Sequence, residues 1–249
     1  MAVSRDLVWE GCVNVRDLGG LPTEDGGETR FGSVIRADSL GLLTEEGWRE
    51  CAATGVTRIV DLRQPEELAA DGTRSSSVDV VQVPILDCYD EQAWAEVEAL
   101  SSGAATNADA QRLVYLHFLD RCRARFAEAV AAVAEAPAGA VVVHCHGGKD
   151  RTGLLVALLL RLGGVPVDAI AEDYALSGTR LRERHERWLA QAEDEVERAR
   201  IERIMSTPAA AMQGVLEAID EQYGGIEQYL RGGGLSAELL AAARSRVRG

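Results

Sequence analysis

Residues 144–153, with the sequence HCHGGKDRTG, place Cys145 six positions before Arg151. A cysteine attacks phosphorus as a thiolate, and a helix N-terminus with a nearby guanidinium stabilises that ionised form. The planar guanidinium of an arginine can hold two oxygens of a phosphoryl group and neutralise their charge. We therefore expect Cys145 to be a thiolate at neutral pH. We also expect Cys145 and Arg151 together to hydrolyse phosphomonoesters through a phosphocysteine intermediate.

The segments on either side of this motif predict how it is positioned. Residues 140–143 are rich in valine, as in a buried strand, and residues 153–160 are typical of a buried helix. A strand that leads through a glycine-containing turn into a helix directs backbone N–H groups into one small space, where anions bind. The other four cysteines have no arginine six positions later and lack this context, so Cys145 is the predicted nucleophile.

The other residues of the loop have predicted roles in substrate binding. Gly147 and Gly148 let the backbone approach a phosphate closely, and Thr152 is placed to hydrogen-bond the sulfur when the phosphocysteine breaks down. Residues 144–146 are adjacent and cannot converge on a zinc ion as tetrahedral ligands do. We predict that the reaction needs neither a metal nor another cofactor.

The loop resembles that of the cysteine-dependent protein tyrosine phosphatases. Its GKDRTG ending is similar to the bacterial branch whose secreted mycobacterial members act on phosphotyrosine, phosphoserine/threonine and phosphoinositides. The likeness covers nearly the whole chain and includes NVRDLGG at 14–20, VIRADSL at 34–40, VDLR at 60–63, IDEQYGG at 219–225 and YLR at 229–231. Residues 37–39 depart from the family pattern, in which arginine and serine are adjacent at this turn. The resemblance implies activity on protein phosphotyrosine, with phosphoserine/threonine and phosphoinositides as further substrates.

A second catalytic group must protonate the leaving oxygen and later activate water. The chain has no Trp-Pro-Asp sequence of the kind that eukaryotic tyrosine phosphatases use. Asp87 follows a predicted strand and, by resemblance, falls where this branch is expected to carry its acid, so it is the preferred candidate. Asp150 could be the acid or could orient Arg151, and Asp90 is a third candidate. Each of these carboxylates could instead be a solvated or loop-capping group.

Lys149 and His146 bear on the choice of substrate. In cysteine phosphatases that act on inositol lipids, a lysine two residues before the arginine adds a positive charge for a ring phosphate, and this chain resembles them at Lys149. His146 lies where lipid-specific enzymes often have lysine, and it would gain charge near pH 6.5, so phosphoinositide turnover is expected to rise in mild acid. The alternative for Lys149 is a solvent-exposed loop charge. The predicted partners are phosphorylated proteins or phosphoinositides.

Alternating strand and helix patterns predict the fold class. Strands are expected at 33–37, 56–62, 78–85 and 140–144, and helices at 44–54, 65–70 and 108–135. Residues 166–249 are expected to be helical, with stops at residues 224–225 and 232–234. The chain is therefore predicted to be a single α/β domain over residues 1–249, with a mostly parallel central sheet flanked by helices and a helical C-terminal portion.

Composition and charge exclude several classes of protein. The net charge of −14 argues against binding of nucleic acid and against stable association with anionic membranes. The N-terminus has no apolar core of a signal peptide, and the apolar run that ends at Leu160 is too short to span a bilayer. Five unevenly spaced cysteines do not suggest a disulfide framework. These features predict a cytoplasmic protein, although related phosphatases can be exported without a conventional signal.

Two charged segments have more than one interpretation. Residues 87–110 are acidic, contain no lysine or arginine, and could form a mobile lid over the pocket or an ordinary surface excursion. Residues 180–203 carry dense alternating charge and are expected to form a solvated helix. His185 on that helix and His117 elsewhere are not expected to take part in catalysis.

Two other functions remain as alternatives. A non-catalytic phosphate-binding module would keep the loop but lack an effective acid, and a rhodanese-like sulfurtransferase also uses a loop cysteine, although the KDRT sequence is unlike it. A nucleotide-binding P-loop is excluded, because Asp150 follows Lys149 where a serine or threonine should hold magnesium and Val143 replaces the first glycine.

Overall fold

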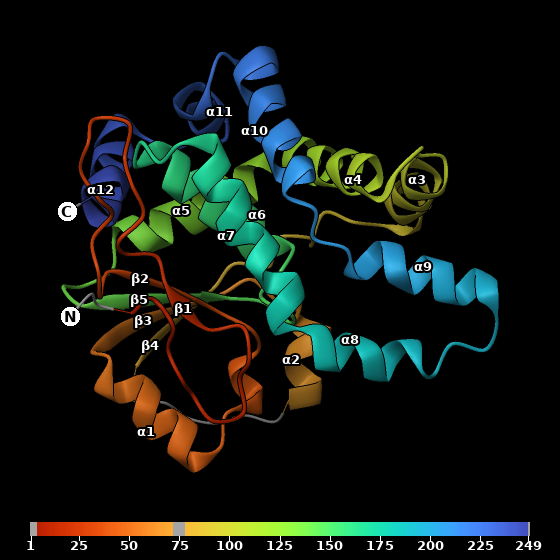
Figure 1. Cartoon of the computed structure of the whole chain (residues 1–249). Helices are drawn as coiled ribbons and strands as arrows, with labels where there is room; N and C mark the ends of the chain where they lie inside the picture. The colour runs from red at the N-terminus through yellow and green to blue at the C-terminus, as the bar shows by residue number, and fades with distance from the viewer. Residues whose placement is uncertain (1–3, 72–77, 249) are drawn as a thin grey trace.

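The valine-rich runs of the sequence form a sheet at the centre of the molecule. Within the residues that the structure describes, 4–71 and 78–248, the computed structural model has five strands in the order β1-β2-β5-β3-β4 (Figure 1). They are β1 (Arg16–Asp17), β2 (Val34–Ala37), β3 (Val56–Asp61), β4 (Asp79–Gln82) and β5 (Ala140–His144). All neighbouring strands are parallel except β1, which is antiparallel to β2. The predicted α/β class with a mostly parallel sheet is confirmed.

Helices cover both faces of this sheet, as Figure 1 shows. In chain order, the helices of the described residues are η1 (Leu40–Leu42), α1 (Glu45–Ala53), α2 (Pro65–Asp71), α3 (Glu91–Ser102), α4 (Asn107–Arg121), α5 (Arg123–Ala134), α6 (Arg151–Leu162), α7 (Val167–Arg180), α8 (Arg182–Leu189), α9 (Glu195–Met205), α10 (Ala209–Tyr223), α11 (Ile226–Gly232) and α12 (Ala237–Val247). Helix α1 lies against one face, and α5 and α6 lie against the other. Among the residues described, no helix is both long enough and apolar enough to cross a membrane.

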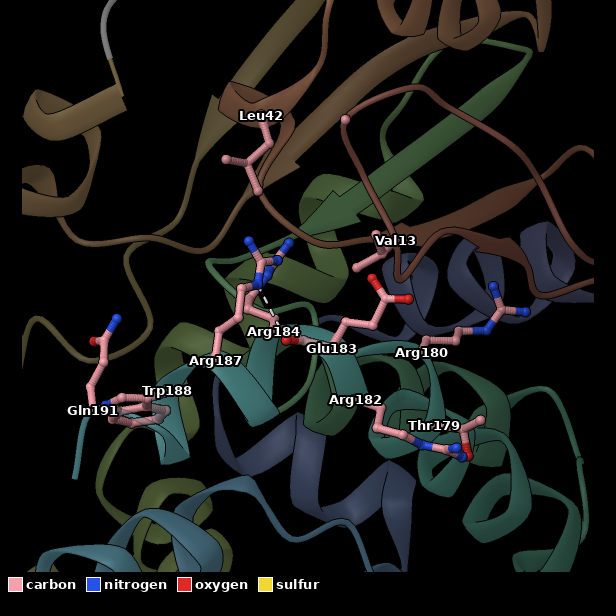
Figure 2. Close-up of a pocket in the computed structure, with 11 residues that line it drawn as sticks. Val13, Leu42, Thr179, Arg180, Arg182, Glu183, Arg184, Arg187, Trp188 and Gln191 are labelled. Carbon is pink, nitrogen blue, oxygen red and sulfur yellow. Dashed lines mark hydrogen bonds between the residues drawn. The ribbon is translucent and has the colours of Figure 1, made fainter.

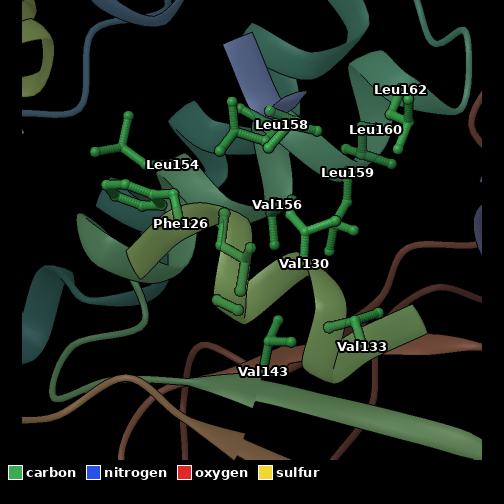
Figure 3. Packing of buried hydrophobic residues seen from close by; sticks show 14 of the residues in the cluster. Phe126, Val130, Val133, Val143, Leu154, Val156, Leu158, Leu159, Leu160 and Leu162 are labelled. Atoms are coloured by element: carbon green, nitrogen blue, oxygen red, sulfur yellow. The ribbon is translucent and has the colours of Figure 1, made fainter. Parts of the chain in front are cut away.

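The core is divided between the two faces by the alternation of side chains along β5. Val141 and Val143 belong to the larger cluster, where they meet α5 and α6, and Ala140 and Val142 belong to the smaller cluster on the α1 side. Figure 3 shows Val143 beneath the valines and the phenylalanine of α5 and the leucines of α6. Because every residue of β5 is buried, the strand holds the segment that follows it at a fixed position.

The positions of most elements agree with the sequence predictions. The helices predicted at 44–54 and 65–70 and the strand at 140–144 are found within one residue of their expected bounds, and the described part of 166–249 is helical. The helix predicted over 108–135 is two helices, because Cys122 leaves the helical conformation at φ −107° and ψ 26°. Strand β4 ends at Gln82, so the strand predicted at 78–85 is shorter than expected.

Two of the five cysteines are bonded to each other, contrary to expectation. Cys88 precedes α3 and Cys122 lies between α4 and α5, and the two form a disulfide across a separation of 34 residues. The prediction of no disulfide was wrong because spacing along the chain does not show that the turn before α3 folds back onto the junction of α4 and α5. The cysteine count therefore no longer supports a cytoplasmic location.

A buried carboxylate joins α7 to the sheet. Asp173 accepts hydrogen bonds from Arg16 Nε at 2.9 Å and from Arg36 Nη1 at 2.8 Å, and it also pairs with Arg5. The side chains of Arg16, Arg36 and Asp173 have no exposed area. Burial opposes the charged form of Asp173, but the charges of Arg16 and Arg36 hold its pKa well below the ordinary value. This cluster fixes α7 against β1 and β2.

Removal of the Asp173 charge should cause a large loss of stability. In Asp173→Asn, two buried guanidinium groups lose their anionic partner, and breaking a buried pair in this way costs about 3–5 kcal/mol. We expect the free energy of unfolding in urea to fall by about that amount. The control is Asp168→Asn, at an exposed position of the same helix, which should change it by less than about 1 kcal/mol. Similar losses in both variants would contradict this account.

Candidate active site

The backbone carbonyl groups of the loop between β5 and α6 are bound by donors that lie outside the loop. Each carbonyl from residue 146 to residue 150 accepts a hydrogen bond from outside the loop. The bonds run from Ser39 N–H to His146 O (3.0 Å), from Asn14 Nδ2 to Gly147 O and Gly148 O (3.1 Å each), from Arg36 Nη2 to Gly148 O (2.6 Å), from Gly153 N–H to Lys149 O (3.0 Å) and from Leu154 N–H to Asp150 O (2.9 Å). In the part of the chain that the structure describes, the N–H groups of residues 146–151 have no acceptor. The loop thus leaves a run of amide donors available to an anion at the N-terminus of α6.

The two glycines of the loop are required for different reasons. Gly148 has a φ of +63°, and a Cβ atom there would lie 2.3 Å from the carbonyl oxygen of Ala37. Only glycine fits at this position without displacing β2. A Cβ atom at Gly147 would meet nothing closer than 4.0 Å, so the protein around it does not demand glycine. A glycine at 147 is needed only if the bound phosphate comes close to the backbone.

Cys145 and Arg151 face one cavity of about 450 Å³. Cys145 is only 2% exposed, yet it belongs to the wall of this cavity. The complete wall is formed by Glu67, Cys145, His146, Gly147, Lys149, Asp150, Arg151, Leu181, Arg184, His185, Trp188, Ile204 and Met205. The structure therefore brings together every predicted loop residue except Gly148 and Thr152, which are buried and do not line the cavity.

Glu67 of α2 holds the guanidinium of Arg151. The two carboxylate oxygens accept from Nη1 and Nη2, the latter at 2.7 Å, and Nη1 also donates to the carbonyl of Leu62 at 3.4 Å. Burial opposes the charged form of Arg151, but the hydrogen bonds that it donates to Glu67 and the charge of Cys145 raise its pKa above the ordinary value. A guanidinium has five N–H donors. Glu67 and Leu62 use three of them, which leaves the Nε–H and one Nη2–H, on the same side of the fork, for two phosphoryl oxygens.

The three remaining binding residues of the loop have different surroundings. Lys149 is 4% exposed, and its Nζ donates to the carbonyl of Ile204 and lies 3.2 Å from Asp150 Oδ1, so it is not a solvent-exposed loop charge. His146 is exposed at the rim of the cavity. Thr152 is fully buried, and its Oγ1 has no hydrogen-bond partner among the described residues. A buried hydroxyl without a partner is costly, which is consistent with its predicted use on the sulfur during turnover.

Asp150 is held at the boundary between two cavities. Its Oδ1 accepts hydrogen bonds from Tyr115 Oη at 2.6 Å and from Gln111 Nε2 at 3.3 Å. Burial and the charge of Asp150 raise the pKa of Tyr115 well above the ordinary value, so this hydroxyl stays a donor. Asp150 occupies the N-cap position of α6 but does not cap the helix, which leaves its carboxylate facing the cavity of Cys145 and a neighbouring one of about 660 Å³.

The other two candidate acids lie in different surroundings. Asp87 pairs with Arg125 of α5, whose Nε donates to it at 3.0 Å. Asp90 caps α3 through the N–H of Ala93 at 2.9 Å. Neither carboxylate is part of the wall around Cys145. The structure thus places only Asp150 beside the predicted nucleophile.

Helices α8 and α9 form the wall opposite the loop. The segment predicted as a solvated helix at 180–203 is divided between α8 and α9, and His185 of α8 lies on the cavity wall. Burial, together with the charges of Lys149 and Arg184, lowers the pKa of His185 to about 4. His185 is therefore neutral at physiological pH. The segment 87–110 contains α3, whose Trp94 and Val97 line the neighbouring cavity rather than the one around Cys145.

A sequence model of the tyrosine phosphatase family matches residues 7–248. Because the match spans nearly the whole chain, the chain belongs to the tyrosine phosphatase family. The resemblance inferred from the HCHGGKDRTG loop is confirmed, and the protein is a phosphatase, which sets aside the sulfurtransferase alternative.

Three relatives are similar over most of their length. A tyrosine-protein phosphatase of Nostoc commune is 30% identical over 231 residues, which are 86% of this chain and 74% of the relative. The triple specificity protein phosphatase PtpB of Mycobacterium tuberculosis is 29% identical over 273 residues and 96% of each chain. A putative tyrosine-protein phosphatase of Cupriavidus necator is 27% identical over 231 residues, with 91% of this chain and 83% of the relative covered.

The ion pair between Glu67 and Arg151 predicts a loss of activity without loss of fold. In Glu67→Gln, Arg151 keeps its charge but loses the carboxylate that orients its fork, and misplacement of a binding group by about 1 Å can cost about 100-fold. We expect kcat/KM for an aryl phosphate to fall by about ten- to a hundredfold. The matched control is Glu66→Gln, an exposed neighbour on α2, which should retain wild-type kcat/KM. If the two variants are equally active, Glu67 does not position Arg151.

The lowered pKa of His185 predicts a pH-dependent contribution to stability. Between about pH 6.5 and pH 4 the unfolded chain binds a proton at His185 that the folded chain does not, so stability falls as the pH is lowered through this window. His185→Gln removes this contribution. Urea unfolding at pH 7 and pH 5 should show a larger loss of unfolding free energy for the wild type than for the variant. Equal losses would mean that His185 titrates alike in both states.

Proposed function

We propose that this phosphatase hydrolyses protein phosphotyrosine through a phosphocysteine formed at Cys145. The observation that carries the proposal is the common cavity of Cys145 and Arg151 beside a loop whose N–H groups are left without acceptors. A phosphoryl dianion there would accept from these amides and from the two remaining donors of Arg151. The same groups would neutralise charge as the phosphoryl group moves between two oxygen atoms and the sulfur.

The first step transfers the phosphoryl group to the enzyme. The Cys145 thiolate attacks phosphorus in line with the leaving oxygen, so the S–P bond forms as the P–O bond to the substrate breaks. Asp150, protonated at this stage, donates its proton to the leaving oxygen. In the second step Asp150 accepts a proton from water as the water oxygen attacks phosphorus, and the S–P bond breaks. The hydroxyl of Thr152 then hydrogen-bonds the thiolate that is released.

Contacts favour Asp150 over Asp87 as the acid. Asp150 shares a cavity wall with Cys145, and Tyr115 and Gln111 hold its carboxylate there from α4. Asp87 is held in an ion pair by Arg125 of α5 and is not part of the wall around Cys145. Asp87 would have to leave this ion pair to reach a substrate.

The walls of the cavity support an aromatic phosphoester as the main substrate. Leu181, Trp188 and Met205 line the side opposite the loop and offer apolar contacts to a phenyl ring. A relative of the chain is named a triple specificity phosphatase, which supports phosphoserine and phosphothreonine as additional substrates. Phosphoinositides are proposed as well, since the Lys149 ammonium lies in the wall of the same cavity.

Substitution of the candidate catalytic residues tests this mechanism. Asp150→Asn should lower kcat by about 10²–10⁴-fold, the usual contribution of general acid–base catalysis, with a smaller loss for aryl phosphates whose leaving group needs no proton. Asp87→Asn should retain most of the wild-type kcat, and Cys145→Ser should have no measurable activity. Each variant is assayed with a phosphotyrosine peptide, a phosphoserine peptide and a short-chain phosphoinositide. A large loss in Asp87→Asn with an active Asp150→Asn would reverse the assignment of the acid.

A further inference from the structure

A cavity of about 800 Å³ adjoins the one that contains Cys145. The two cavities share Arg184 and Trp188 of α8. The walls of the larger cavity are formed by Gly11, Val13, Leu42, Thr179, Arg180, Arg182, Glu183, Arg184, Arg187, Trp188 and Gln191. A substrate held at Cys145 could therefore extend into this space along α8.

Two of its arginines lie on the same face of α8. Arg184 and Arg187 are three residues apart, and both side chains point from the helix toward Leu42 (Figure 2). Arg184 Nη2 donates to Asp38 at 2.8 Å. Arg187 donates only through Nε, to the carbonyl of Glu183 at 3.3 Å, and no carboxylate pairs with it in the described ranges. The carboxylate of Glu183 points away from the pair, toward Val13.

The local charge around Arg184 and Arg187 is positive, although the protein as a whole is acidic. Asp38 is fully buried, and its carboxylate accepts hydrogen bonds from the N–H groups of Val13 and Asn14 as well as from Arg184. The negative charge of Asp38 is therefore not available to Arg184 alone. Two guanidinium groups on one face of a helix repel each other, and an anion between them would relieve that repulsion. In a chain with a net charge of −14, this is a local site for an anionic group.

Apolar side chains accompany the two arginines. Val13, Leu42 and Trp188 are 48%, 44% and 42% exposed, and all three line the same cavity. A surface that combines exposed apolar side chains with the guanidinium of Arg187, which has no carboxylate partner among the described residues, suits a polypeptide that carries acidic residues. An extended anionic membrane would face the net negative charge of the whole protein, whereas one acidic side chain of a peptide meets only the local positive charge of Arg184 and Arg187.

We propose that Arg184 and Arg187 form a subsite for an acidic side chain near the phosphotyrosine of a substrate peptide. The inference rests on the proposed function, because it needs phosphotyrosine at Cys145. The carboxylate accepts hydrogen bonds from the free Nη groups of Arg187 and from Arg184, while neighbouring apolar side chains of the peptide pack on Val13, Leu42 and Trp188. The subsite selects among phosphotyrosine peptides and takes no part in the chemical steps.

A pair of matched peptides tests the subsite. The two share one phosphotyrosine sequence and differ only in having glutamate or glutamine at the flanking positions. We expect the wild type to prefer the acidic peptide by about fivefold in kcat/KM, mainly through KM, since a charge pair at an accessible site is worth about 1 kcal/mol. Arg187→Gln should abolish this preference, and Arg187→Lys should keep part of it. Thermal unfolding midpoints confirm that each variant is folded.

A third arginine of the same helix provides the control. Arg182 also borders the cavity, but its side chain points toward Thr179, away from Arg184 and Arg187 (Figure 2). Arg182→Gln makes the same change in net charge and should keep the preference for the acidic peptide. If Arg182→Gln and Arg187→Gln reduce the preference equally, the effect is general electrostatic attraction and the subsite is disproved.

Two further substrates separate failure of this inference from failure of the proposed function. Para-nitrophenyl phosphate reports the chemistry alone. If the wild type hydrolyses it and both peptides with no preference, the subsite is wrong and the phosphatase mechanism stands. If the wild type hydrolyses para-nitrophenyl phosphate but neither peptide, the proposed peptide substrate fails. If Arg187→Gln impairs turnover of a short-chain phosphoinositide and leaves the peptide preference intact, the cavity serves a lipid head group and the inference is overturned.

Discussion

The shape of the catalytic loop depends on the hydrogen bonds that Gly148 O accepts from Arg36 and Asn14. A carbonyl oxygen that pointed into the cavity would repel a phosphate. When the carbonyl points away from the cavity, the N–H groups of the neighbouring residues can point toward the anion. Arg36 can hold this carbonyl because Asp173 fixes the other end of the same guanidinium. The phosphate site is therefore connected, through one arginine, to the buried ion pairs that attach α7 to the sheet.

The cationic groups of the site are paired before any substrate arrives. Arg151 is bound by Glu67, Lys149 lies against Asp150 and the carbonyl of Ile204, and Arg184 is bound by Asp38. Pairing keeps each side chain in one orientation and removes the cost of ordering it when the phosphate binds. Arg151 still has donors on the side that Glu67 leaves open.

Sequence reasoning predicted the family and the class of fold, because both depend on local pattern. A valine-rich strand, a glycine turn and an apolar helix are consecutive in the chain, so β5, the loop and α6 could be predicted together. Glu67 was missed because its role depends on the adjacency of β3 and β5 in the sheet, which brings the segment after β3 close to Arg151. That strand order is a property of the whole fold. Glu67 also accepts a hydrogen bond from the N–H of Gln64 at 2.8 Å, but Gln64 is not one of the residues that mark a helix start in a sequence.

The helix α8 has no buried residue, although it lines both the cavity that contains Cys145 and the larger cavity of about 800 Å³ beside it. Substitutions on such a surface helix usually cost little stability. Exchange of side chains on α8 would therefore reshape the walls of these cavities and leave the packing of Cys145 and the sheet in place.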